Sequence, residues 1–338
     1  MIVFSNNEWS QLEEIIVGRA TNALIPYADN SVRNFMYARM ELQDIQKFVG
    51  PYDEKIINET NEDLEALCEK LLELKIKVHR PEIHNHHDQI KTTDWVTTGW
   101  ANYCPRDVLL IVDDKIVEVP SPMRSRIFET HSYHKILYKA FENGAKWFSA
   151  PRPRILNKEF QFDDLNKPTL NDGEILFDAA NIVRLGNTLL YQKSNSGNIT
   201  GYNWLCSMFE EKNIILEEKA YSGAHMDSTI IPLREGLVLL NGNRVTEDRY
   251  PKIFKDWEKI FFEEIIDADS YENGISSNAI ALNLLSINEN LVILDEKQRP
   301  LINKLKKYKI ESIPMRLRHS RTLGGGFHCA TLDLKRKK

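Results

Sequence analysis

The sequence predicts an α/β fold built from five similar units that close into a ring, as in a propeller. Two observations lead to this prediction. A hairpin pattern, in which an apolar run, a short polar turn and a second apolar run follow one another, occurs five times. A stretch with apolar residues at helical spacing follows each hairpin, and several of these stretches run into a short β-like segment such as residues 76–78. The unit is therefore strand, strand, helix and strand.

The five hairpins are expected to begin near residues 14, 107, 181, 229 and 282. Most of their turns contain Asp, Asn or Gly, residues that favour chain reversal. The paired apolar runs are residues 14–17 and 23–25, 108–112 and 116–119, 182–185 and 189–191, 229–233 and 237–240, and 282–287 and 291–294.

The expected helices lie near residues 60–72, 133–141, 204–209, 253–261 and 301–308. In the first, Thr60 and Asp63 resemble a capping box. Uneven spacing of the units argues against a fixed-period solenoid. No G-x-G-x-x-G follows an early strand, which disfavours a Rossmann fold. We predict a single domain over residues 1–338, with an ordinary two-domain α/β protein as the alternative.

Composition excludes several classes of function. The chain has 338 residues, of which 42% are hydrophobic and 28% charged, with a net charge of −5 and both signs interspersed. No basic stripe suggests nucleic acid, and no apolar run reaches the roughly 18 residues of a membrane span. The four cysteines form no C-x-x-C pair, which favours a reduced cytoplasm over a disulfide scaffold or a zinc ribbon.

Unusual polar residues occur at the same end of the units. They precede four of the hairpins and follow the fifth unit, in residues 104–107, 177–181, 225–229, 274–278 and 324–329. If the units repeat around an axis, these segments converge on one face. Three successive glycines, Gly324 to Gly326, allow a close approach of the backbone to a ligand and would present the thiol of Cys329.

The residue types in these segments indicate covalent chemistry on a cation. Cys329 and His225 are suited to act as nucleophile and acid/base, and Asp178 can orient the imidazole. Asp107 and Asp227 suit a cation such as a planar guanidinium, whose carbon a thiolate can attack. The alternative is that each residue is a turn or cap residue, and that Cys329 is a small buried cysteine in a loose tail.

The other histidines are interpreted differently. His79, His84, His86 and His87 are expected in a solvated loop, since no carboxylate spacing indicates a metal site. His328 adjoins the nucleophile, but neighbouring side chains usually diverge, so His225 is the better base.

Seven short motifs resemble the arginine-dependent amidinotransferases of the pentein fold, over most of the chain and in family order. The matching segments are residues 105–108, 123–126, 144–147, 177–180, 192–205, 225–227 and 324–329. This resemblance implies a five-fold pseudosymmetric α/β-propeller. It also implies transfer of the amidino group from L-arginine to an acceptor amine by a ping-pong route, with no metal or organic cofactor. A homodimer is a further implication.

The resemblance assigns roles residue by residue. Cys329 would be the nucleophile, His225 the general acid/base and Asp178 its partner, while Asp107 and Asp227 would hold the guanidino group.

Three more residues would bind the donor amino acid. Arg244 would bind its α-carboxylate, and Ser276 and Ser277 would help to position it.

Two departures leave the acceptor open. Asn181 replaces an acidic residue of the glycine-using enzyme, and Ser222-Gly223-Ala224 replaces a run beside its acceptor site, so glycine is in doubt. Two rival functions remain. A guanidine hydrolase would use the same catalytic residues, and a non-catalytic arginine-binding protein would share the scaffold.

Overall fold

The structure, a computed structural model, describes residues 3–267 and 274–338. Within these ranges five three-stranded sheets share one plan: two strands pair antiparallel, and a third adds parallel to one of them. The sheets consist of β21 (Thr331–Arg336), β1 (Leu12–Val17) and β4 (Lys77–His79); β7 (Leu109–Val112), β8 (Lys115–Glu118) and β9 (Lys146–Ser149); β12 (Ile182–Leu185), β13 (Thr188–Gln192) and β14 (Asn213–Glu217); β15 (Ile230–Arg234), β16 (Leu237–Asn241) and β17 (Glu258–Phe262); and β18 (Leu285–Asn288), β19 (Leu291–Asp295) and β20 (Glu311–Met315).

The apolar cores show that the five sheets close into a ring. Alternate side chains of a strand point to opposite faces, so each sheet can pack against two neighbours. Ile16 of β1 packs with the second sheet, while Ile15 packs with the fifth. The second and third, third and fourth, and fourth and fifth sheets share three further clusters. The predicted α/β-propeller is therefore confirmed.

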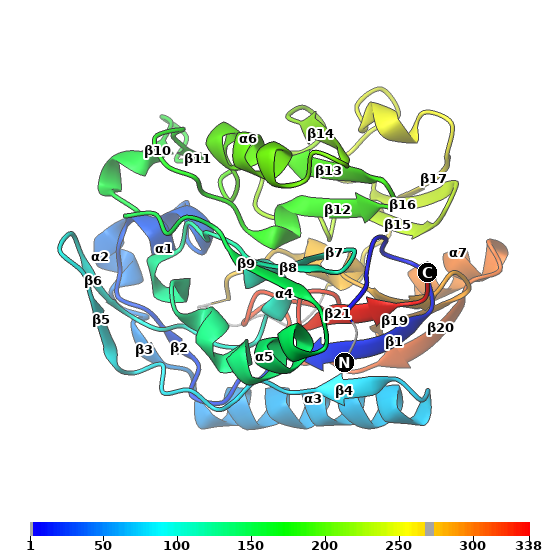
Figure 1. Cartoon of the computed structure of the whole chain (residues 1–338), viewed down its shortest axis with the longest axis horizontal. Helices are drawn as coiled ribbons and strands as arrows, with labels where there is room; N and C mark the ends of the chain where they lie inside the picture. Colours follow the sequence, from blue (N-terminus) through cyan, green and yellow to red (C-terminus); the bar gives the residue numbers. More distant parts are fainter. Residues whose placement is uncertain (1–2, 268–273) are drawn as a thin grey trace.

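The first predicted hairpin is wrong. β1 pairs antiparallel with the C-terminal strand β21 and parallel with β4, so the two ends of the chain lie in one sheet (Figure 1). β2 (Leu24–Ile25) pairs instead with β3 (Gly50–Pro51). The reason is that residues 18–24 do not turn back: backbone N–H groups of Arg19 and Leu24 bond to the carbonyls of Asn102 and Trp100. The other four hairpins are confirmed.

Four of the five predicted helices are confirmed, and they lie on the outside of the sheets (Figure 1). They are α3 (Glu54–Glu73), α5 (His134–Glu142), α6 (Ile199–Met208) and α7 (Arg299–Lys307). The predicted capping box of the first is wrong, because α3 begins earlier: the carboxylate of Asp53 accepts from the backbone N–H of Lys55. Thr60 lies inside the helix and bonds to the carbonyl of Ile56.

The fourth predicted helix is wrong. A 3₁₀ turn at Lys252–Phe254 is followed, after residues 255–257, by β17. Ile260 and Phe262 pack into the cluster shared with the fifth sheet, while Phe261 between them packs into the cluster shared with the third. The pattern of apolar residues here has a period of two, which is that of a strand.

Shorter elements complete the described chain. They are α1 (Asn30–Phe35), α2 (Leu42–Ile45), α4 (Pro105–Val108), the pair β5 (Gln89–Lys91) and β6 (Val96–Thr98), the pair β10 (Phe160–Phe162) and β11 (Pro168–Leu170), and further 3₁₀ turns at Arg124–Arg126, Glu129–Tyr133, Asn157–Glu159, Ala179–Asn181 and Asn278–Leu282. None of the helices in the described ranges is long and apolar enough to cross a membrane.

Candidate active site

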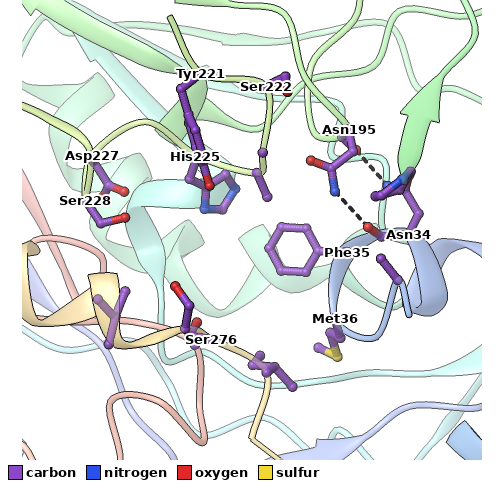
Figure 2. A pocket seen from close by; sticks show the side chains of 18 of the residues that line it. Asn34, Phe35, Met36, Asn195, Tyr221, Ser222, His225, Asp227, Ser228 and Ser276 are labelled. Carbon is purple, nitrogen blue, oxygen red and sulfur yellow. Dashed lines mark hydrogen bonds between the residues drawn. The ribbon is translucent and has the colours of Figure 1, made fainter. Parts of the chain in front are cut away.

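A pocket of about 280 Å³ gathers most of the residues that the sequence singled out. Its lining includes His225, Asp227, Arg244 and Cys329, together with Ser276 and Ser277. Asp107 and Asp178 contact His225 from behind the pocket wall. The segments that precede or follow strands in different sheets therefore converge on one face, as the ring arrangement requires. Figure 2 shows His225, Asp227 and Ser276 around the open space.

The loop that carries Cys329 is packed too tightly for side chains at its glycines. A Cβ at Gly325 would lie 2.5 Å from Sγ of Cys104, and one at Gly326 would lie 2.7 Å from Cβ of Asn283. Gly324 has a φ of +75°, in the left-handed region. The backbone N–H of Cys329 donates to Oδ1 of Asn283 at 2.8 Å. The loop is thus held rigidly, and Cys329 is not in a loose tail.

The thiol of Cys329 donates to Oδ2 of Asp227, with 3.1 Å between Sγ and the oxygen. A hydrogen bond with Cys104, burial, and the carboxylates of Asp227 and Asp107 all raise the pKa of Cys329 well above its usual value. These effects keep the residue as a thiol. A bound cation between the two carboxylates would offset their effect.

His225 has the geometry of an oriented acid/base. Its Nε2 lies 2.9 Å from Oδ2 of Asp178, and its Nδ1 lies 3.6 Å from Oδ1 of Asp107. Burial disfavours the imidazolium, but Asp107, Asp178 and Asp227 outweigh it and raise the pKa of His225 to about 9. The residue also has a φ of +55°, a costly backbone conformation for histidine that the surrounding structure maintains.

Asp107 lies in α4 and is held by Arg126, whose Nη1 donates to its Oδ2 at 2.7 Å. Burial raises the pKa of Asp107. Its other oxygen receives no hydrogen bond from the part of the chain that the structure describes. The guanidinium of Arg126 also pairs with Glu129 and lies 4.8 Å from the ring centroid of Trp100. A buried cation thus orients one of the two predicted guanidinium-binding carboxylates.

Arg244 also lines the pocket. Its guanidinium donates to the hydroxyls of Thr229 and Ser277, each at 2.8 Å, and lies 4.6 Å from the ring centroid of Tyr221. No carboxylate within residues 3–267 and 274–338 forms an ion pair with Arg244. This arrangement leaves the positive charge available to an anionic group of a ligand. Ser276 is half-buried and lines the same side of the pocket.

His328 is a site residue that sequence reasoning missed. The expectation that the side chains of His328 and Cys329 diverge is wrong: Nδ1 of His328 reaches Oδ2 of Asp227 at 2.8 Å, the same oxygen to which the thiol of Cys329 donates. Its Nε2 lies 3.3 Å from Oε2 of Glu8. Glu8 in turn forms a salt bridge with the buried Arg184. Glu8 lies before β1, just as the other polar segments lie before their strands. This shared position could have identified Glu8 from the sequence.

The two departures from the glycine-using enzyme lie in different places. Ser222, Gly223 and Ala224 line the pocket. Asn181 does not: it is buried and bonds to the hydroxyls of Ser194 and Ser196.

The histidine loop is only partly solvated, contrary to expectation. His84 and His87 are exposed, but His79 is half-buried in β4 and His86 is buried, with Nε2 2.8 Å from Oδ1 of Asn102. In the described part of the chain no three potential ligands are grouped to hold a metal ion.

Comparison with known proteins finds close relatives but no matching family model. The chain is 41% identical to inosamine-phosphate amidinotransferase 1 of Streptomyces griseus over 337 residues, covering 99% of this chain and 97% of the relative. It is 34% identical to L-arginine:L-lysine amidinotransferase of Pseudomonas savastanoi pv. phaseolicola, with 99% and 94% covered. It is 30% identical to the mitochondrial glycine amidinotransferase of Xenopus tropicalis, with 99% and 83% covered.

Solved structures agree with these relatives. An inosamine-phosphate amidinotransferase from Streptomyces griseus superposes with a TM-score of 0.95 at 41% identity, covering 99% of this chain and 97% of the other. A DDAH from Pseudomonas aeruginosa superposes with a TM-score of 0.63 at 15% identity, covering 95% and 99%, which is a likeness of fold alone.

Proposed function

Since this chain belongs to the amidinotransferase family, we propose that it moves the amidino group of L-arginine to an acceptor amine through a covalent amidino-Cys329 intermediate. Amidino transfer from arginine is the activity of the enzyme. The covalent route and the role of each residue are our proposal. One observation carries it: the thiol of Cys329, the imidazole of His225, the carboxylate of Asp227 and the guanidinium of Arg244 line one pocket of about 280 Å³, and Asp107 contacts the imidazole from behind.

The binding of arginine is proposed to use both ends of the pocket. Its guanidinium would lie between Asp107 and Asp227, and its α-carboxylate would pair with Arg244 beside Ser277, with Ser276 helping to position the amino acid. The positive charge of the guanidinium compensates the two carboxylates that keep Cys329 protonated. The pKa of the thiol then falls, its proton leaves to solvent, and the thiolate forms where the electrophilic carbon is bound.

The first half-reaction follows from this arrangement. The thiolate of Cys329 attacks the guanidinium carbon, and a tetrahedral adduct forms in which carbon bears sulfur and three nitrogens. The imidazolium of His225, charged at neutral pH and oriented by Asp178, gives its proton to the nitrogen that leaves. The C–N bond breaks, ornithine departs, and a cationic amidino-cysteine and a neutral His225 remain.

The second half-reaction reverses the proton transfer. The acceptor amine attacks the amidino carbon and gives a proton to His225, and the C–S bond breaks to release the guanidino product and the thiolate. No residue of this scheme needs a metal or organic cofactor, and water must be excluded from the amidino carbon while the amine is absent.

We propose an acceptor other than glycine. The relatives are named for inosamine-phosphate, lysine and glycine, so the family does not decide the acceptor. Ser222, Gly223 and Ala224, which depart from the glycine-using enzyme, line the pocket. Asn181 gives the proposal no support, because it lies outside the lining.

Incubation with arginine and a panel of amines tests the proposed function, with ornithine, citrulline and guanidino products measured in one sample. We expect ornithine only in the presence of a suitable amine, with one guanidino product for each ornithine. Citrulline and ammonia formed without an amine would show hydrolysis and overturn the proposal. Arginine binding without any turnover would instead indicate a binding protein.

Three further proposals concern the whole molecule. The full chain, residues 1–338, acts as one domain, which the shared sheet of β1 and β21 supports. The enzyme works in the cytoplasm, which the four free cysteines support. It forms a homodimer, as family resemblance implies, and light scattering after gel filtration would measure the mass.

A further inference from the structure

Asn34 and Asn195 form a reciprocal pair at the edge of the pocket. Nδ2 of Asn34 donates to the backbone carbonyl of Asn195 at 2.6 Å, and Nδ2 of Asn195 donates to the backbone carbonyl of Asn34 at 2.7 Å. Both bonds are drawn in Figure 2. The two residues are 1% and 5% exposed. The pair joins the end of α1 to the loop after β13, so each carboxamide is fixed in position.

The pair leaves both carboxamide oxygens without a partner. Neither Oδ1 receives a hydrogen bond from residues 3–267 or 274–338. Because each Nδ2 must face a carbonyl, the opposite atom of each carboxamide has to be the oxygen, and a flipped assignment is excluded. A buried acceptor without a donor destabilises a protein and calls for an explanation, such as a ligand that supplies the donor.

The oxygen of Asn195 points toward the reacting centre. In Figure 2 it faces the space between His225 and Phe35, away from Asn34. The ring of Phe35 lies 5.2 Å from that of His225, measured between centroids. The proposed partners of the donor amino acid, Arg244 and Ser277, bond to each other, and Arg244 lies over the ring of Tyr221, which Figure 2 shows away from this pair. The proposed contacts of arginine therefore do not include the oxygen of Asn195, whereas an acceptor amine that approaches His225 comes near this oxygen.

We infer that Asn195, held in place by Asn34, is a specificity-determining residue for the acceptor, and that its carbonyl oxygen accepts a hydrogen bond from a hydroxyl or second ammonium group carried near the reacting amine. The inference rests on the proposed function. It names the acceptor class as amino alcohols or diamines. An amine whose neighbouring group is a carboxylate, such as glycine, would face an oxygen that repels it.

Ping-pong kinetics provide the test, since kcat/KM for arginine and for the acceptor report separate half-reactions. The probes are ethanolamine, ethylenediamine and ethylamine, and their cyclohexyl counterparts 2-aminocyclohexanol, 1,2-diaminocyclohexane and cyclohexylamine. We expect the unmodified enzyme to prefer the amino alcohol or the diamine to the plain amine. Asn195→Ala should lower kcat/KM for the preferred acceptor about tenfold, the typical effect of one lost hydrogen bond, and leave the plain amine and the arginine half-reaction within about twofold.

A second variant and a control keep the test decisive. Asn195→Asp retains an acceptor oxygen and adds a negative charge, so it should favour the diamine over the amino alcohol. Asn213→Ala, in the exposed first residue of β14, should change none of these ratios. Thermal unfolding of each variant reports folding.

Two results would overturn the inference. One is an equal preference for all three amines of a set in the unmodified enzyme. The other is a loss in Asn195→Ala that falls equally on arginine, which would make the residue structural or part of the donor site. If the unmodified enzyme forms citrulline and transfers to no amine, the proposed function fails as well, and that result appears before any variant is made.

Discussion

His328 and Asp227 are joined by a 2.8 Å contact between Nδ1 and Oδ2, and the same oxygen accepts the thiol proton of Cys329. The second ring nitrogen of His328 faces a carboxylate oxygen of Glu8. Both ring nitrogens of the half-buried His328 thus face carboxylate oxygens, in contact with the carboxylate that also binds Cys329. Burial favours a neutral Asp227, but the bond and charge of His328 outweigh it and hold the pKa of Asp227 well below its usual range.

Replacement of His328 by Asn should therefore impair the use of arginine. Without the hydrogen bond and charge of His328, Asp227 binds a proton at a higher pH, and a neutral carboxyl no longer attracts a guanidinium. We expect KM for arginine to rise about tenfold at neutral pH, since one charge-assisted bond is lost. The acid limb of the profile of kcat/KM for arginine against pH should move to higher pH. A profile that keeps its acid limb would show that His328 acts only in packing.

Cys329→Ala should abolish turnover and leave arginine binding measurable by calorimetry, because the carboxylates and Arg244 are untouched. Mass spectrometry of the unmodified enzyme, quenched with arginine and no amine, should show one amidino group on Cys329. Cys206→Ala is the matched control, since Cys206 lies half-buried in α6, and it should keep full activity. Turnover by Cys329→Ala would disprove the nucleophile assignment.

Arg244→Ala should affect donors according to their α-carboxylate. The guanidinium of Arg244 is held by Thr229 and Ser277 beside the pocket. We expect kcat/KM for arginine to fall at least tenfold, because an ion pair to a charged group is lost. The value for agmatine, which lacks the carboxylate, should change little. An equal loss with both donors would contradict the assignment.

His225 should make stability depend on pH in the alkaline range. Its pKa is raised from about 6.5 in an unfolded chain to about 9 in the fold. A raised pKa means that the charged form stabilises the fold, so the contribution is complete below pH ~6.5 and is lost as pH rises through about 9. Urea unfolding between pH 6 and 9.5 should show a steeper decline in the free energy of unfolding than the same series with His225→Asn. Parallel declines would mean that the carboxylates do not hold the imidazolium.

Several features of the molecule follow from local patterns of residues. The hairpins of the second to fifth sheets could be predicted because each has its two strands and turn in one continuous segment. The first could not, since the partner of β1 is β21, at the opposite end of the chain. The prediction of the fourth helix was wrong for a related reason. Ile260, Phe261 and Phe262 are covered by neighbouring sheets that pack on both faces of β17, and the sequence of this segment does not show those sheets.

Residue types and motif order alone pointed to a nucleophilic cysteine, an imidazole and a cation-binding pair of carboxylates, since chemistry depends on which groups are present. Which atoms meet was decided only by the tertiary structure. Closing the ring brings Asp227 into contact with His328, which lies 101 positions away in the chain. It also joins Asn34 to Asn195, 161 positions away, through hydrogen bonds from each side-chain amide to the other residue's backbone carbonyl. No local rule encodes contacts at such separations, because they depend on how five sheets pack at once.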